Sequence, residues 1–108
     1  MIDLEILRRV EATLIERKQA APGTSYAASL YAKGTDSICK KVAEEAAETI
    51  MAAKDGDSLH LVREVTDLWF HSMLLLTHFG LSIDDVVSEF RRREGISGIE
   101  EKKSRTPQ

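Results

Sequence analysis

Two groups of carboxylates in this sequence have the chemistry and spacing of a metal site. Glu44, Glu45 and Glu48 form the pattern E-E-x-x-E in one segment. Glu64 and Asp67 form the pattern E-x-x-D in a later segment. On a helix, residues three apart lie roughly 60° apart around the axis and project to the same side. Carboxylate oxygens suit a hard divalent cation such as Mg²⁺, which typically binds a few carboxylates together with substrate phosphates.

Both acidic groups border the apolar face of a predicted helix. If Glu45 is set at zero on a helical wheel, Val42 lies at about +60° on the apolar side and Glu48 at about −60°. Glu64 is similarly close to Leu61. The short Asp-Gly-Asp segment at 55–57 predicts that the two helices are antiparallel neighbours. We therefore expect the carboxylates to converge between two packed helices.

The charge of these acidic groups has two explanations. Like charges gathered at low dielectric repel one another, so a bound cation is needed to neutralise them. The competing interpretation is an exposed acidic face paired with Lys40 and Lys41, which is common for a single E-x-x-E on a helix. Exposed pairing does not explain Glu64 and Asp67, which lie within an otherwise apolar segment. The second acidic pair therefore favours metal binding.

Hydrophobic residues recur at helical spacing in four segments, which must position these acids. They predict helices over residues 3–20, 35–54, 58–80 and 82–94. Pro22 and Gly23 end the first helix, and the small residues of 23–35 predict a loop. The period-two alternation and hairpin signals that indicate strands are absent. The predicted fold class is all-α, a helical bundle of four main helices.

Length and composition fit one small domain. The chain has 108 residues, and we expect a helical domain over residues 1–95 and a polar, flexible tail over 96–108. The net charge of −3 argues against a nucleic-acid partner. The single Cys39 excludes an intrachain disulfide and suits a reducing cytoplasm. The N-terminus lacks a signal-peptide pattern, and charges interrupt the apolar stretch 59–79, so we expect a cytoplasmic protein with no membrane segment.

The acidic pattern resembles that of the all-α nucleoside triphosphate pyrophosphohydrolases, which include the MazG-like enzymes and the dimeric dUTPases. Within this superfamily the chain looks most like the phosphoribosyl-ATP pyrophosphatases of histidine biosynthesis, and the likeness covers about residues 4–94. Three elements carry it: Ser25-Tyr26-x-x-Ser29-Leu30-x-x-Lys33-Gly34, then Ile38-x-x-Lys41-Val42-x-Glu44-Glu45, and Asp67-Leu68-x-x-His71.

The resemblance implies an enzyme that hydrolyses phosphoribosyl-ATP to phosphoribosyl-AMP and pyrophosphate. It implies Mg²⁺, with Mn²⁺ as an alternative, bound by Glu45, Glu48, Glu64 and Asp67. Such an ion polarises phosphates and lowers the pKa of a bound water, and phosphoryl transfer needs charge neutralisation more than a nucleophilic side chain. Glu44 is the candidate catalytic residue that orients or deprotonates the water, a role that Glu45 could share.

Further residues are candidates for binding the nucleotide. The resemblance assigns Ser25, Tyr26, Lys33 and Lys41 to the substrate, although lysines of this kind are more often solvated surface residues. His71 lies one turn beyond Asp67, where it could orient that carboxylate or be a satisfied core histidine. The tyrosines at 26 and 31 could stack on a purine or fill a gap under the loop. Arg91, Arg92 and Arg93 could bind phosphates or complement the helix dipole.

Two other functions are compatible with the sequence. One is a housekeeping pyrophosphohydrolase that acts on free (d)NTPs, and the other is a non-catalytic helical assembly module. The segment 58–80 is apolar around most of its circumference, and three other helices cannot easily cover it in a chain of this length. We therefore predict a homodimer.

Overall fold

The computed structural model describes residues 1–105 and contains no strand within them. The all-α prediction is confirmed. The elements in chain order are α1 (Ile6–Arg17), a short 3₁₀ helix η1 (Pro22–Thr24), α2 (Tyr26–Lys33), α3 (Thr35–Asp55), α4 (Ser58–His78), α5 (Ile83–Arg93) and α6 (Gly98–Arg105). The four predicted helices correspond to α1, α3, α4 and α5, with ends that differ by a few residues. None of the described helices has the length and apolar character needed to cross a membrane.

Helix ends follow the local signals of the sequence. The Asp57 side chain accepts a hydrogen bond from the His60 N–H at 3.1 Å and caps α4. Ser82 and Asp85 form a capping box at the start of α5. Gly56 adopts φ 75° between α3 and α4, a left-handed conformation that favours glycine. This tight turn makes α3 and α4 an antiparallel pair.

The predicted loop at 23–35 is wrong, because most of it forms helix α2. Ser25 caps this helix by accepting a hydrogen bond from the Ala28 N–H at 3.0 Å. Ala27, Ala28 and Leu30 are buried. Small residues here allow close packing against neighbouring helices, which the local composition alone does not distinguish from a loop.

The segment after residue 95 also contains a helix that the sequence analysis missed. Helix α6 is held to α5 by an ion pair of 2.6 Å between Arg92 Nη2 and Glu101 Oε1. Arg105 lies 3.2 Å from the same Glu101 oxygen, and Glu101 is buried. The expectation of a flexible tail is therefore corrected for residues 98–105, and its last residues, 106–108, lie outside the described part of the chain.

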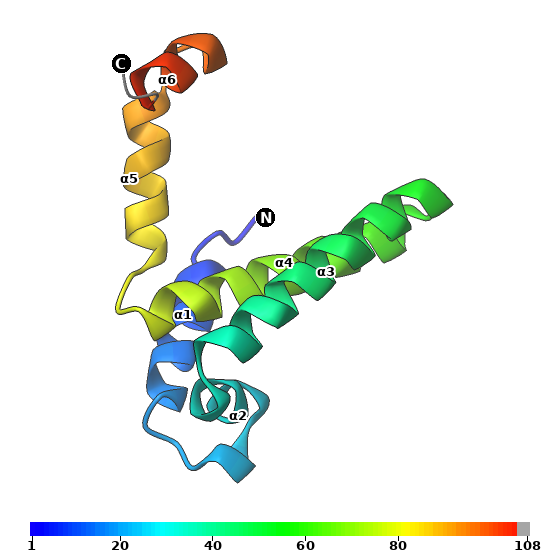
Figure 1. Cartoon of the computed structure of the whole chain (residues 1–108), viewed down its shortest axis with the longest axis vertical. Helices are drawn as coiled ribbons and strands as arrows, with labels where there is room; N and C mark the ends of the chain where they lie inside the picture. Colours follow the sequence, from blue (N-terminus) through cyan, green and yellow to red (C-terminus); the bar gives the residue numbers. More distant parts are fainter. Residues whose placement is uncertain (106–108) are drawn as a thin grey trace.

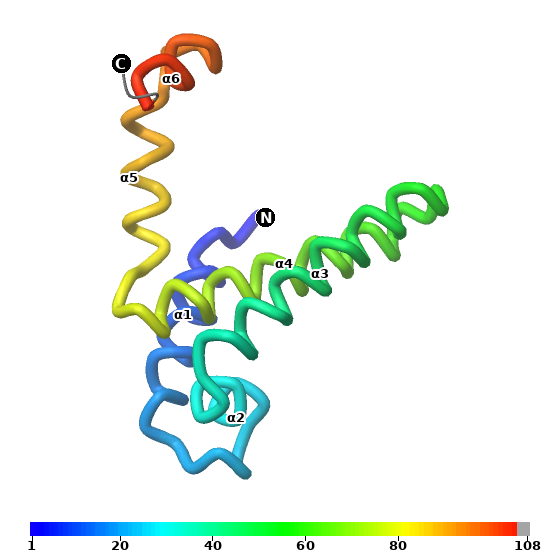
Figure 2. The backbone as a smooth tube through the Cα atoms, viewed as in Figure 1, coloured from blue at the N-terminus to red at the C-terminus, as the bar shows by residue number. Residues whose placement is uncertain are grey.

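Figures 1 and 2 show α3 and α4 side by side as a long hairpin that projects beyond the other helices. Helices α1 and α2 pack at one end of it, and α5 and α6 extend away from it. The core lies where α1, α2, α3 and α4 meet, and contains Leu14, Ala27, Leu30, Ile38, Met73 and Leu74. The acidic residues lie on the hairpin, beyond this core.

Candidate active site

Three of the predicted metal ligands meet between α3 and α4. Carboxylate oxygens of Glu45 and Glu48 on α3 and of Glu64 on α4 all lie within 4.8 Å of one another. The spacing of three residues puts the first two on one side of α3, and the antiparallel turn brings Glu64 opposite them. The structure therefore brings these three predicted ligands together as an acidic cluster, the name used below.

Two carboxylate oxygens of the acidic cluster have no hydrogen-bond partner among the described residues. Glu45 is only 6% exposed, and its Oε2 atom is buried without a hydrogen-bond partner, as is Oε2 of Glu64. The nearby carboxyl group of Glu48 raises the pKa of Glu64, and burial and the negative charges of Glu45 and Asp67 raise it further. Buried oxygens without partners are costly. A divalent cation with oxygen ligands fits this donor set, since it would pair both orphaned oxygens.

Asp67 lies apart from the acidic cluster. It is one turn further along α4 than Glu64, its side chain is exposed, and it is not among the carboxylates that meet within 4.8 Å. The structure therefore places three of the four predicted ligands together, and the role of Asp67 stays a prediction.

Lys41 places a positive charge at the edge of the site and pairs there with Glu44. Lys41 Nζ lies 3.2 Å from Glu44 Oε2 and 3.7 Å from Glu45 Oε1. The hydrogen bond to Glu44 raises the pKa of Lys41, so the lysine stays charged. Lys41 therefore offsets part of the negative charge beside the cluster. Glu44 is tied to this lysine and lies on the neighbouring face of α3, next to the cluster but not within it.

His60 is a site residue that the sequence analysis did not assign. Its Nε2 atom lies 3.4 Å from Glu64 Oε1, one helical turn away on α4. This contact engages one oxygen of Glu64 and leaves Oε2 as the oxygen without a partner. The spacing of four residues between the two side chains was the available signal.

Of the two roles that the sequence left open for His71, the structure does not show the contact with the Asp67 carboxylate. Its Nδ1 atom lies 2.7 Å from the backbone carbonyl oxygen of Asp67, and its Nε2 atom lies 2.7 Å from the hydroxyl of Tyr26. The His71 side chain thus connects α4 to the first residue of α2. The alternative of a satisfied, buried histidine is the one that the structure supports.

Tyr26 lies at the edge of the charged site. Burial raises the pKa of its hydroxyl, the positive charge of Lys41 lowers it, and the carboxylates of Glu45, Glu44 and Asp67 raise it. Its ring stacks against Phe70 with centroids 6.4 Å apart. By contrast, the Tyr31 hydroxyl donates to the backbone carbonyl of Leu14 at 2.9 Å, which makes it part of the packing between α1 and α2.

The remaining candidate substrate residues lie on α2. Ser25 is the N-cap, and its Oγ accepts a backbone hydrogen bond, so its structural role is clear. Lys33 is exposed at the last turn of α2, before Gly34. Neither residue contacts the acidic cluster in the structure, and their binding to substrate stays a prediction.

The three consecutive arginines are mostly engaged within the protein. Arg92 and Arg93 both contact Glu89, at 2.7 and 3.0 Å, and Arg92 also contacts Glu101. These ion pairs lower the pKa of Glu89 to about 2. Arg91 makes no such pair among the described residues. The ion pairs favour a structural role for Arg92 and Arg93 over a phosphate contact, which was one of the two roles left open for them.

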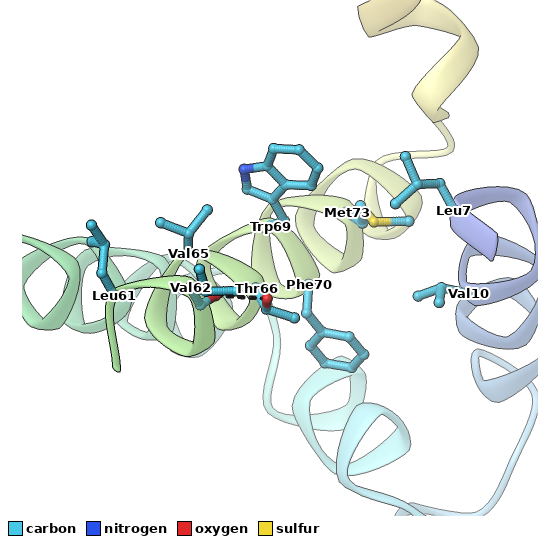
Figure 3. A pocket seen from close by; sticks show the side chains of 9 residues that line it. All are labelled: Leu7, Val10, Leu61, Val62, Val65, Thr66, Trp69, Phe70 and Met73. Carbon is cyan, nitrogen blue, oxygen red and sulfur yellow. Dashed lines mark hydrogen bonds between the residues drawn. The ribbon is translucent and has the colours of Figure 1, made fainter. Parts of the chain in front are cut away.

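A surface groove that is apolar lies apart from the acidic cluster. It lies between α4 and α1, has a volume of about 570 Å³, and contains no ionisable side chain. Figure 3 shows residues of α4 along the groove, with Leu7 and Val10 of α1 opposite them. An apolar groove of this kind is unsuited to a polyphosphate. The acidic cluster is therefore a better candidate than the groove for the chemistry.

Comparison with known proteins agrees with this site. The family model for phosphoribosyl-ATP pyrophosphohydrolase matches residues 7–94. The chain is 78% identical over 106 residues to the phosphoribosyl-ATP pyrophosphatase of Aromatoleum aromaticum, covering 98% of both chains. It is 78% identical to that of an Azoarcus species, covering 97% of this chain and 98% of the relative, and 63% identical to that of Chromobacterium violaceum, covering 95% of both. The chain therefore belongs to the phosphoribosyl-ATP pyrophosphohydrolase family.

Proposed function

We propose that this protein hydrolyses phosphoribosyl-ATP to phosphoribosyl-AMP and pyrophosphate, the second step of histidine biosynthesis. The observation that carries the proposal is the acidic cluster, with its two orphaned carboxylate oxygens, in a chain that matches this family over residues 7–94. Cleavage of a phosphoric anhydride requires charge neutralisation, and the acidic cluster supports the proposal because its oxygen donors suit an ion that would provide it.

We propose Mg²⁺, with Mn²⁺ as an alternative, as the ion bound by Glu45, Glu48 and Glu64, with Asp67 at the edge of the site. When bound, the ion would neutralise phosphate charge and acidify a water molecule. Lys41 lies beside the cluster and supplies a positive charge for the phosphates. Glu44, held by Lys41, is the candidate for orienting or deprotonating the attacking water.

We propose that the protein is a homodimer. Trp69 is 57% exposed at the apolar groove between α1 and α4, and Val62 is similarly exposed. Helix α5 also presents exposed Val87 and Phe90. Burial of apolar surface contributes about 25 cal/mol per Å², so a second copy that covers the groove would stabilise the assembly. Sedimentation at micromolar concentration should give about twice the chain mass of 12.1 kDa, and a monomer mass contradicts the dimer.

The proposed substrate, the net charge and the single cysteine bear on the partners and the location of the protein. The substrate is a small nucleotide, and the net charge of −3 gives no basis for a nucleic-acid partner. We expect the protein in the cytoplasm, in keeping with its single cysteine.

The experiment is pyrophosphate release by the purified protein from a panel of nucleotides. With Mg²⁺, we expect rapid turnover of phosphoribosyl-ATP, slow or no turnover of ATP, dUTP and dCTP, and no turnover of any substrate with a chelator. Equal or faster turnover of the free nucleotides indicates a housekeeping pyrophosphohydrolase. No turnover of any substrate indicates an assembly module and overturns the proposal.

A further inference from the structure

A chain of hydrogen bonds connects the Asp67 backbone carbonyl, the His71 ring and the Tyr26 hydroxyl. The ring of His71 is 5% exposed, with Nδ1 2.7 Å from the carbonyl oxygen of Asp67 and Nε2 2.7 Å from the Tyr26 hydroxyl. The ring also contacts the aromatic faces around it, with centroids 5.6 Å from Tyr26 and 5.3 Å from Phe70. Both nitrogens of the imidazole are therefore engaged, and the ring packs against two aromatic side chains.

The direction of these hydrogen bonds follows from the carbonyl. A backbone carbonyl oxygen only accepts, so the proton of the neutral ring is on Nδ1. Nε2 then has no hydrogen, and the Tyr26 hydroxyl must donate to it. Because the phenol proton is committed to His71, the Tyr26 oxygen offers only its lone pairs to any other group.

The Tyr26 hydroxyl lies near the charged residues at and beside the acidic cluster. Tyr26 is half-exposed at the start of α2, and its hydroxyl is close enough to Lys41 and Glu45 to feel both charges. Two other candidate substrate residues belong to the same helix, Ser25 as its N-cap and Lys33 in its last turn. His71 thus connects the helix with these residues to α4, the helix that supplies Glu64.

We infer that His71 is a positioning residue that orients Tyr26 as a hydrogen-bond acceptor for a hydroxyl or amino group of the nucleotide substrate. This inference rests on the proposed function, because it places the nucleotide at the acidic cluster. Tyr26 would then contribute to substrate selectivity, because its oxygen favours nucleotides that place a hydrogen-bond donor opposite it. It also explains why a buried histidine in α4 contacts the first residue of α2.

The test uses the full-length protein and steady-state kinetics on phosphoribosyl-ATP. Tyr26→Phe keeps the ring and removes the oxygen, so we expect KM to rise about 5- to 10-fold, the value of one hydrogen bond, with kcat within about twofold. Tyr31→Phe is the matched control, because its hydroxyl bonds only to packing groups of the protein. It should lower the melting temperature and leave KM unchanged.

Variants of His71 separate positioning from packing. His71→Gln retains an acceptor near the place of Nε2 and should restore most of the affinity that His71→Leu loses. In the Tyr26→Phe background, His71→Leu should raise KM by less than about twofold more, because its effect acts through the missing oxygen. If His71→Leu does not fold, the glutamine variant and Tyr26→Phe decide the question. An unchanged KM in Tyr26→Phe, or additive effects in the double variant, overturns the inference.

A structural readout distinguishes this inference from the proposed function. ¹⁵N NMR of the ligand-free protein should show the proton of His71 on Nδ1, and Tyr26→Phe should shift the Nε2 resonance. These results need no turnover, so they hold even if phosphoribosyl-ATP is not the substrate. A proton on Nε2 in the neutral ring contradicts the assigned direction of the hydrogen bonds and overturns the inference, whatever the substrate.

Discussion

The substitution Glu45→Gln should raise the stability of the metal-free protein while it destroys the catalytic site. Glu45 is buried, one of its oxygens has no hydrogen-bond partner, and it lies within 4.8 Å of the carboxylates of Glu48 and Glu64. Glutamine keeps the shape and removes the charge. The substitution therefore removes the repulsion between Glu45 and the carboxylates of Glu48 and Glu64. It also removes one ligand of the proposed cation.

The expected gain follows from the distances. Two unit charges about 5 Å apart interact by about 3 kcal/mol at an effective dielectric constant of 20. Glu45 has two such like-charged neighbours and one opposite charge, Lys41, at 3.7 Å. The net repulsion on the Glu45 charge is smaller than this sum, because the raised pKa of Glu64 lowers its negative charge and solvent screens Glu48 and Lys41. We expect a gain of about 1 kcal/mol, which corresponds to a rise in melting temperature of about 4–8 °C for a domain of this size.

Calorimetry with and without the cation measures this effect. In chelator, Glu45→Gln should melt above the wild type at the same protein concentration. With Mg²⁺ at about 100 times its Kd, the wild type should gain about 2.7 kcal/mol, and the variant less than half of that. Glu44→Gln is the matched control: it loses an exposed pair with Lys41, should not gain stability in chelator, and should keep its response to Mg²⁺. A variant that melts below the wild type in chelator and keeps the full response to Mg²⁺ would refute the reasoning.

Three further predictions concern the substrate helix, the titration of the cluster and the C-terminal helix. Lys33→Ala should lower kcat/KM for phosphoribosyl-ATP at least about tenfold with little change in melting temperature, because Lys33 is exposed and has no ion pair within residues 1–105; a change in melting temperature alone argues against the substrate role. The pKa of Glu64 is raised above 4.5 in the folded state, so its contribution to stability is present at low pH and is lost as pH rises through that raised pKa. Urea unfolding in chelator should show this loss in the wild type and not in Glu64→Gln. Glu101→Gln should weaken the ion pair with Arg92, so amide hydrogen exchange in α6 should become faster while exchange in α3 and α4 stays the same. Unchanged exchange in α6 contradicts the view that this ion pair holds α6 to α5.

The acidic cluster could be predicted from sequence because its geometry is local. The spacing of Glu45 and Glu48 determines which side of α3 they share, and the turn at Gly56 determines that α4 runs back alongside it. Helical periodicity and a short connection are sufficient for that inference. Asp67 has the same spacing of three residues from Glu64 that Glu48 has from Glu45, so helical periodicity does not explain why its carboxylate is outside the cluster.

Helices α2 and α6 were missed although both have start signals. Ser25 caps α2, and Ser97 accepts a hydrogen bond from the Glu100 N–H at 3.1 Å at the start of α6. The Ser-x-x-Glu spacing of Ser97 and Glu100 is typical of a helix start. What keeps these short helices formed is tertiary: the burial of Leu30 in one and the ion pairs of Glu101 in the other. A short helix without an amphipathic pattern cannot be recognised from its own sequence when its stability comes from distant residues.

His71 illustrates a different limit of sequence reasoning. A histidine one turn after an aspartate on a helix can reach either the aspartate side chain or its backbone carbonyl. The choice depends on what lies at the other ring nitrogen, and that partner, Tyr26, is 45 residues away in a segment expected to be a loop. Once α2 is a helix capped by Ser25, its first residue is fixed against α4, and the Tyr26 hydroxyl meets Nε2. The sequence analysis missed helix α2 and left the role of His71 open for the same reason, because the partner of Nε2 lies in that helix.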